Sequence, residues 1–339
     1  MTETPRSFAA TPDRPSAAGP DLLSDVFRAV HLTGGVFLSA CFTEPFGVID
    51  PKSYDQRTPM ARLRHVSILH LIVDGACEFE SAGLQRAVGA GDLIFLPLPN
   101  AYKFWSGKPA RIADASEVVK PGTLEGLWLA DYGGGGSAVR MVCGFIESAE
   151  FLFTPVFRSL PSVIVERTTE DAVGALMAST VREIVTRVEA GVPGSHAILG
   201  RLMELLFVEL LRRHVARMPA GSTGWFAALK DPVVARALQL LHASPAHRWT
   251  VEEIAQRIGS SRTVLGERFN ALLGRPPIDY LVGWRIQLAA ERLRAGQESV
   301  PRIAESVGYE SEAAFSRAFK RVTGTTPGAW RETLGTDPH

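Results

Sequence analysis

The sequence has little cysteine: Cys41, Cys77 and Cys143 are the only three in 339 residues. No two of them stand in a Cys-x-x-Cys spacing, which argues against a disulfide scaffold or a zinc finger. A reducing compartment is the simpler setting for so few thiols, so we expect a cytoplasmic protein. Cys41 and Cys143 leave a redox-sensing pair open as a hypothesis, with buried inert cysteines as the favoured alternative.

Long apolar runs are also lacking. No stretch approaches eighteen uninterrupted apolar residues, so we expect no membrane span. The first twenty residues are rich in Pro, Ala, Ser and Thr and contain no apolar core, unlike a secretory signal. The composition predicts a disordered tail over residues 1–20.

Net charge is absent overall, with 36 basic and 36 acidic residues, but the two kinds are unevenly placed. Residues 230–334 hold 15 Lys or Arg against 11 Asp or Glu, whereas residues 1–229 hold 21 against 24. A mildly basic C-terminal part fits a polyanionic partner, although an imbalance this small also arises by chance.

Short apolar or alternating runs, separated by Gly, Pro and Asp, fill residues 21–168. Runs of this length and spacing predict many short strands, arranged as a barrel or a sandwich. They comprise Val36–Phe42, Val66–Val73, Ala76–Phe79, Asp92–Leu96, Gly126–Leu129 and Val163–Val165.

The apolar period changes to three and four residues over 169–218, which predicts a helical hairpin with its turn at Ala190–Gly194. The second helix is apolar around more of its circumference than one buried face needs. Burial against the strands and a homodimer interface both explain this, and we favour the dimer. The Pro, Ala, Gly and Ser of residues 219–230 are typical of a linker.

Two copies of one helical pattern occupy residues 231–334. The first runs Thr250-Val-Glu-Glu-Ile-Ala-Gln-Arg-Ile-Gly259 and continues to Phe269, whereas the second runs Ser299-Val-Pro-Arg-Ile-Ala-Glu-Ser-Val-Gly308 and continues to Phe319. A capped helix, a turn containing Gly and a second helix is the pattern of a helix-turn-helix. Its repetition, with a long helix over Pro277–Leu293 between the copies, is a much stronger signal than either copy alone.

These segments resemble the DNA-binding domain of the AraC-type transcription regulators. The resemblance rests on Trp284-Arg-Ile-Gln-Leu-Ala-Ala-Glu-Arg-Leu, on Val307-Gly-Tyr-Glu-Ser-Glu-Ala-Ala-Phe-Ser-Arg-Ala-Phe-Lys-Arg and on Gly324-Thr-Thr-Pro-Gly-Ala-Trp-Arg331. It implies an all-α domain over residues 231–334 with two recognition helices. Held rigidly, such helices enter successive major grooves about 34 Å apart on double-stranded DNA.

Matching the family pattern position by position places the DNA contacts on those two helices. Base contacts are expected from Arg262, Thr263 and Glu267 in the first unit and from Glu312, Ala313 and Arg317 in the second. Phosphate contacts are expected from Arg268, Lys320 and Arg321. Solvated helix charges are the alternative, and Glu267, where a polar or basic residue is often found, predicts weaker DNA contacts by the first unit. Arg285 is expected to form an internal salt bridge.

The N-terminal strands resemble the cupin domain found in many AraC-type regulators. The matching segments are His70-Leu-Ile-Val-Asp-Gly75, Gly91-Asp-Leu-Ile-Phe-Leu-Pro97, Cys143-Gly144 and Leu160-Pro161. Metal-dependent cupins need several His and a Glu around one metal. Here only His70 is in place, and Tyr102 follows Pro97 where the second motif usually supplies a His. We therefore expect no metal and no cofactor.

A ligand-binding barrel is the favoured interpretation of the N-terminal domain. His70, Tyr102 and Trp105 are the candidate pocket residues, with ordinary packing as the alternative. The sequence thus predicts a multidomain α+β protein: a cupin-like β-barrel over 21–168, a dimerising helical hairpin and a tandem helix-turn-helix domain. Its predicted function is sequence-specific transcription regulation modulated by a small-molecule effector, with RNA polymerase as a partner if it activates. The alternatives are a cupin-type metalloenzyme with a DNA-binding tail and a regulator controlled without such an effector.

Overall fold

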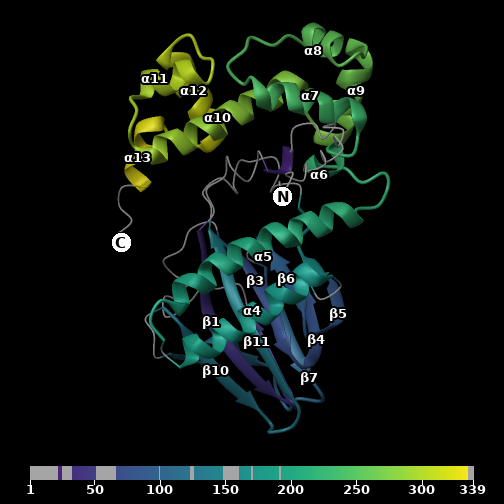
Figure 1. The fold of residues 1–339 in the computed structure, drawn as a ribbon, viewed down its shortest axis with the longest axis vertical. Helices are drawn as coiled ribbons and strands as arrows, with labels where there is room; N and C mark the ends of the chain where they lie inside the picture. The colour runs from purple at the N-terminus through teal and green to yellow at the C-terminus, as the bar shows by residue number, and fades with distance from the viewer. Residues whose placement is uncertain are drawn as a thin grey trace, which may run out of the picture.

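The computed structural model describes residues 22–24, 33–50, 66–98, 100–122, 126–147, 160–168, 171–190 and 192–334. The tail expected over residues 1–20 lies outside them. Figure 1 shows strands gathered in one body, covered by two long helices, and a second body made of helices.

The described strands form a seven-stranded sheet and a five-stranded sheet. In order across the first, these are β12 (Ile164–Arg167), β6 (Asp92–Leu96), β3 (Val66–Asp74), β11 (Ala138–Glu147), β1 (Thr33–Thr43), β10 (Trp128–Gly133) and β9 (Val119–Pro121). In order across the second, they are β5 (Leu84–Gly89), β4 (Ala76–Ser81), β7 (Tyr102–Ser106), β2 (Phe46–Asp50) and β8 (Ala113–Asp114), and the short helix α2 (Ala115–Val118) follows β8. The predicted barrel is therefore built as two sheets in a jelly-roll-like arrangement.

Strand β3 is buried on both faces, which explains its nearly continuous apolar sequence. Ile68 and Ile72 belong to the core between the two sheets, whereas Leu69 and Leu71 belong to the core beneath the covering helices. This alternation is the ordinary two-residue period of a strand. It places His70 on the same inner face as Ile68 and Ile72.

Helices α4 (Ala172–Glu189) and α5 (Ser195–Arg217) form the predicted hairpin. They cover the outer face of the seven-stranded sheet (Figure 1). Close approach of α5 to β1 requires glycine, since a Cβ on Gly200 would lie 2.8 Å from the carbonyl oxygen of Gly34. Phe207 of α5 packs against Phe95 of β6 with ring centroids 4.9 Å apart. Burying one such side chain contributes about 1.5–3 kcal/mol.

The helical body contains α6 (Trp225–Ala228), α7 (Pro232–Ala243), α8 (Val251–Arg257), α9 (Arg262–Leu273), α10 (Pro277–Ala295), α11 (Val300–Ser306), α12 (Glu312–Thr323) and α13 (Pro327–Leu334). Helix α6 corrects the expectation of a linker over 219–230. Trp225 and Phe226 are fully buried, and Trp225 Nε1 donates a hydrogen bond to the Tyr280 hydroxyl at 2.8 Å. The packed helical domain therefore begins at α6, before Asp231.

The helix starts follow local sequence rules. Asp231, Thr250, Ser261 and Ser311 each cap a helix, with the side-chain oxygen accepting a backbone N–H two or three residues later. Ser299 begins α11 without such a side-chain bond.

Candidate nucleic-acid interface and its regulatory domain

Two helix-turn-helix units are present, α8 with α9 and α11 with α12, and α10 connects them (Figure 1). Gly259 and Gly308, with φ of 68° and 88°, form the turns, a left-handed conformation that glycine adopts readily. Phe269 of α9 and Phe319 of α12 are fully buried, as their matching places in the repeat predict. Each second helix is thus anchored by an aromatic residue and presents its opposite face to solvent.

Arg285 of α10 holds the two units together. Its guanidinium donates hydrogen bonds to the carbonyl oxygens of Pro245, His247 and Gly308, at 2.6, 2.9 and 3.3 Å. The first two acceptors lie in the loop before α8, whereas the third lies in the turn of the second unit. The prediction of an internal salt bridge for Arg285 is wrong, because its hydrogen-bond partners are backbone carbonyls.

Gly308 adds a steric constraint to the same junction. A Cβ on Gly308 would lie 2.6 Å from the carbonyl oxygen of Ala246, so the loop of the first unit packs directly on the turn of the second. Burial lowers the pKa of Arg285 from its usual value, but a guanidinium remains charged at neutral pH.

In α9, the predicted DNA-contact residues Arg262, Thr263, Glu267 and Arg268 are all exposed. Both arginines already have carboxylate partners. Arg262 Nη1 pairs with Glu252 of α8, and Arg268 Nη1 lies 2.9 Å from Asp231 Oδ2. The positive charge of this helix is therefore largely neutralised within the protein.

In α12, Glu312, Ala313, Arg317, Lys320 and Arg321 are likewise exposed. Within the described residues, the side chains of Arg317 and Lys320 form no ion pair and no hydrogen bond. Arg317 occupies the place in the repeat that Glu267 occupies in α9. The second recognition helix thus presents unpaired cations where the first presents an acidic residue.

The outward face of α9 includes two residues beyond the predicted DNA contacts, Gly266 and Asn270. They share a helix face with Thr263 and Glu267, since residues three and four apart are neighbours. The helical period in the printed sequence could have identified both. Asn270 is exposed, and a carboxamide there suits bidentate pairing with adenine.

His70 and Tyr102 lie together between the two sheets, with ring centroids 4.7 Å apart. His70 is 1% exposed, its Nδ1 lies 2.9 Å from Cys143 Sγ, and its Nε2 has no hydrogen-bond partner in the described chain. Burial lowers the pKa of His70 to about 3, so the ring is neutral at pH 7. Burial also raises the pKa of the Cys143 thiol, with the Asp50 charge as a lesser cause.

Trp105, the third candidate pocket residue, points the other way. Phe104 faces the inner core, so its neighbours Lys103 and Trp105 face outward on β7. The Lys103 ammonium lies 4.5 Å from the centroid of the Trp105 ring and forms an ion pair with Glu80. Trp105 therefore does not line the space between the sheets.

The three cysteines are free thiols, and Cys41 lies on a different face of its sheet from Cys143. Cys143 belongs to the inner core, whereas Cys41 alternates with the inner residues Ala40 and Phe42 and so lies on the opposite face of the sheet. This geometry does not bring Cys41 and Cys143 together as a thiol pair.

No group of three or more His, Cys, Asp or Glu side chains within the described ranges is arranged to hold a metal ion. None of the described helices has both the length and the apolar character of a membrane-spanning segment.

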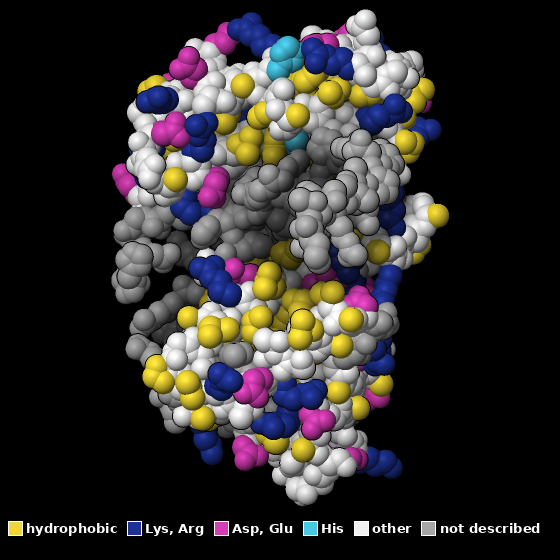
Figure 2. Space-filling model, in the orientation of Figure 1, with side chains coloured by type: hydrophobic (Ala, Val, Ile, Leu, Met, Phe, Trp, Pro, Cys, Tyr) yellow, Lys and Arg dark blue, Asp and Glu magenta, His cyan; other side chains and the backbone are white. Residues whose placement is uncertain are grey.

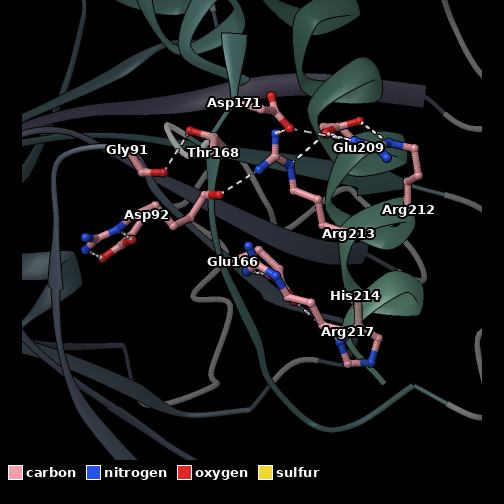
Figure 3. A network of polar contacts seen from close by, with 11 residues as sticks. Gly91, Asp92, Glu166, Thr168, Asp171, Glu209, Arg212, Arg213, His214 and Arg217 are labelled. Atoms are coloured by element: carbon pink, nitrogen blue, oxygen red, sulfur yellow. Dashed lines mark hydrogen bonds and ion pairs between the residues drawn. The ribbon is translucent and has the colours of Figure 1, made fainter. Parts of the chain in front are cut away.

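A network of charged residues joins the C-terminal part of α5 to the edge strand β12 and to its neighbour β6 (Figure 3). Arg213 is 5% exposed and donates to the Glu209 carboxylate at 2.6 Å and to the Arg167 carbonyl at 3.0 Å. It also pairs with Asp171 at 2.7 Å. A buried cation needs such partners, because its charge has been removed from water.

The same network reaches β6 and the last turn of α5. Arg167 pairs with the buried Asp92, and Arg217 pairs with the buried Glu166 at 2.5 Å. Beyond α5, Lys230 Nζ of the helical body donates to the carbonyl oxygens of Ala216 and Met218, at 3.4 and 3.1 Å. Polar contacts of neighbouring residues thus extend from the sheet domain, along the end of α5, to Lys230 of the helical domain.

Comparison with known proteins identifies both parts. Residues 21–216, more than half of the chain, match a family model described as cupin, and residues 254–333 match one described as a helix-turn-helix domain. The chain is 34% identical over 264 residues to a putative AraC-like transcription regulator of Streptomyces antibioticus, covering 76% of this chain and 84% of that protein.

Two further relatives agree with this assignment. A putative AraC-like transcription regulator of Streptomyces lividans is 36% identical over 263 residues, covering 76% of this chain and 84% of the relative. The HTH-type transcriptional regulator AlkR of Acinetobacter baylyi is 26% identical over 328 residues, covering 92% and 99%. The chain therefore belongs to the family of AraC-like transcription regulators, with a cupin domain followed by a helix-turn-helix domain.

Proposed function

We propose that α9 and α12 contact base edges in successive major grooves, and that α12 supplies most of the electrostatic attraction to DNA. The observation that carries this proposal is the pairing of cations. Arg262 and Arg268 of α9 face carboxylates, whereas Arg317 and Lys320 of α12 have no such partner in the described chain. Unpaired cations gain more from a phosphate or a guanine edge, because no internal ion pair has to be broken.

Footprinting on DNA upstream of the gene tests the placement. We expect protection of two adjacent major grooves on one face of the duplex, weakened by Arg317→Ala. Arg236→Ala is the matched control, because Arg236 lies on α7 and its guanidinium binds the Pro232 carbonyl. Uniform protection with a steep salt dependence would contradict specific contacts by these helices.

Dimerisation through α4 and α5 is the second part of the proposal. Leu199, Met203 and Leu206 of α5 are buried against the sheet, which accounts for much of its apolar circumference. Four further apolar side chains on the two helices are more than half exposed: Val173, Leu176, Ile198 and Leu205. Figure 2 shows hydrophobic side chains gathered on the surface over these helices. A second copy would cover them.

Sedimentation of the full-length protein tests the dimer. Leu176→Asp combined with Leu205→Asp is expected to give a monomer that remains folded, because both side chains are exposed. Leu84→Asp, an exposed leucine on β5 of the other sheet, is the control and is expected to leave the mass unchanged. A wild-type protein that sediments as a monomer at all concentrations would exclude this interface.

The cupin domain is proposed to bind an uncharged small molecule beside His70. If the Cys143 thiol donates to Nδ1, the His70 proton lies on Nε2, and that N–H is buried without an acceptor. Leaving such a donor unpaired costs about 1–3 kcal/mol, which a ligand oxygen would recover. We therefore propose that this site binds a regulatory ligand, and that it is not the metal-dependent active site of an enzyme.

We propose that the effect of ligand binding is transmitted to the DNA-binding helices through β6, the charged network at the end of α5 and Lys230. Strand β3 pairs His70 with Ile94 of β6, and β6 carries the Asp92 of that network. A ligand that favours one arrangement of α5 would shift how the helical domains are presented. Lys230→Met is expected to leave both domains folded and to remove the effect of effectors on DNA affinity. An unchanged effector response in Lys230→Met would exclude this route. We further propose that the protein acts in the cytoplasm and that it contacts RNA polymerase if it activates transcription.

A further inference from the structure

Gly266 lies in the middle of the face that α9 turns to solvent. Thr263, Glu267 and Asn270 on this face are exposed, and Gly266 is half-buried among them. The helix runs from Arg262 to Leu273, so Gly266 is an interior helical residue and neither a cap nor a terminus.

Packing within the described chain does not explain this glycine. A Cβ built on Gly266 would meet no atom within 4 Å, apart from the neighbouring residues and the helix's own backbone. Its φ is not among the positive values, so the conformational freedom of glycine is not used either. A glycine inside a helix is less stable than alanine, because more backbone entropy is lost on folding. Neither packing within the described chain nor backbone conformation thus accounts for this destabilising glycine.

The second unit differs at the matching place. There α12 carries Ser316, which projects a hydroxymethyl group beside Ala313 and Arg317. Side-chain contact at this place is therefore compatible with the helix-turn-helix itself. The missing side chain is a property of α9 alone.

We propose that Gly266 lets a thymine methyl group pack directly on the backbone of α9, closer than any side chain would permit. The inference rests on the proposed placement of α9 in a major groove. Without a side chain, Gly266 offers an apolar Cα surface and no hydrogen-bonding group beyond the helical backbone. The C5-methyl of thymine is the apolar group on the major-groove edge of base pairs. Thr263, one turn earlier on this face, adds a second methyl to the contact.

Two sets of measurements test this on the full-length protein and the DNA fragment that it protects. Gly266→Ala is expected to raise the melting temperature by roughly 2–4 °C, because it removes helical glycine. The same change is expected to weaken specific DNA binding about tenfold, which corresponds to the loss of one good base contact. Gly266→Ser, which copies Ser316, is expected to weaken binding similarly.

Gly283→Ala is the matched control. Gly283 lies inside α10, and its Cβ would meet only Arg275 Nη1 at 4.0 Å, so the change is expected to stabilise the protein without altering DNA affinity. On the DNA side, each thymine of the α9 half-site is replaced singly by deoxyuridine, which removes only the methyl. One replacement is expected to weaken the wild type several-fold and to leave Gly266→Ala unaffected.

The outcomes separate the two proposals. A Gly266→Ala protein that is more stable and binds the fragment as tightly as the wild type would overturn the inference on Gly266 while the two-groove footprint stands. A deoxyuridine scan in which no position matters would overturn the thymine assignment. If the wild type protects no specific fragment, the placement of α9 fails first, and this inference fails with it.

Discussion

Helices α9 and α12 come from two copies of one sequence pattern, yet they present different charges to solvent. Both begin with a serine cap, bury a phenylalanine and end at a glycine in the left-handed region. At the matching outward place, however, α9 has Glu267 and α12 has Arg317. The repeat therefore preserves what folding each unit requires and varies what each unit presents to solvent.

The difference extends to ion pairing. Carboxylates of Glu252 and Asp231 hold the two α9 arginines, so a contact with DNA must compete with an existing pair. Exposed pairs of this kind are worth only about 0.2–1 kcal/mol, so they reduce attraction without abolishing it. We infer a division of roles: α12 attracts and anchors, and α9 contributes through close fit.

The largest effect is expected where the two units are joined. Arg285→Met removes three charge-assisted hydrogen bonds and leaves backbone carbonyls without donors at the junction. We expect the helical domain to lose about 3 kcal/mol of unfolding free energy, measured by urea denaturation, and the two-groove footprint to shrink to one. Equal stability and an intact footprint would show that α10 alone fixes the spacing of the units.

Removing the outward cation of α12 tests the asymmetry itself. Arg317→Ala is expected to weaken specific binding by about 2 kcal/mol, roughly thirtyfold, because an unpaired bidentate donor is lost. Arg262→Ala is expected to cost clearly less, because that arginine already has the Glu252 partner. Fluorescence anisotropy on one DNA fragment measures both. An equal loss of affinity in the two variants, or a larger loss in Arg262→Ala, would refute this ranking.

Acid is expected to weaken the first unit selectively. Burial lowers the pKa of His242 to about 3, and its ring stacks on Trp284 with centroids 3.9 Å apart. The unfolded chain binds this proton near pH 6.5, so stability is complete above pH 6.5 and is lost as the pH falls towards 3. At pH 5 the loss is about 2 kcal/mol.

Hydrogen exchange at pH 7 and pH 5 locates this acid effect. We expect faster exchange in α7–α9 and little change in α12, because the sequence has no histidine between residues 300 and 334. His242→Phe is expected to remove the difference. Equal acceleration in both units would mean that another group controls it.

Salt dependence should differ between the cations of the two helices that are expected to contact phosphate. Lys320→Ala is expected to reduce the slope of log K against log salt by about 0.9, the value for one lost phosphate contact. Arg268→Ala is expected to change it less, because Arg268 pairs with Asp231. Titrations at four or more salt concentrations measure both slopes. Identical slopes for the two variants would remove the distinction between the helices.

The smallest effect is expected from freeing a cation of α9. Glu252→Gln releases Arg262 from its partner, so affinity should rise two- to fivefold, in keeping with an exposed pair of at most about 1 kcal/mol. The salt slope should become steeper at the same time. Weaker binding by Glu252→Gln would show that the pair positions Arg262 for DNA.

Local rules predicted the helical domain well from the sequence, and distant contacts limited the prediction. Caps such as Thr250 and Ser261 act within three residues, so their bonds follow from spacing alone. The partners of Arg285 lie 23 to 40 residues away, and no local pattern indicates them. The burial of Trp225 could not be predicted from its segment of linker composition, because its partner Tyr280 is 55 residues away.

The cupin domain was less predictable for a related reason. Strand β3 is apolar on both faces, so its sequence does not reveal which side chains face the second sheet. The direction of Trp105 follows from the burial of its strand neighbour Phe104 in the core between the sheets, which only the folded structure reveals. The His70–Cys143 contact joins strands 73 residues apart, and only the pairing of β3 with β11 brings them together.

Hydroxyl-radical footprinting of the wild type, Arg317→Ala and Arg262→Ala, in parallel on the DNA upstream of the gene, tests the central claim most directly. Two protected adjacent grooves are expected for the wild type. Arg317→Ala is expected to lose protection of one groove at protein concentrations where Arg262→Ala still protects both. Equal effects of the two variants, or uniform coating of the fragment, would contradict the central claim.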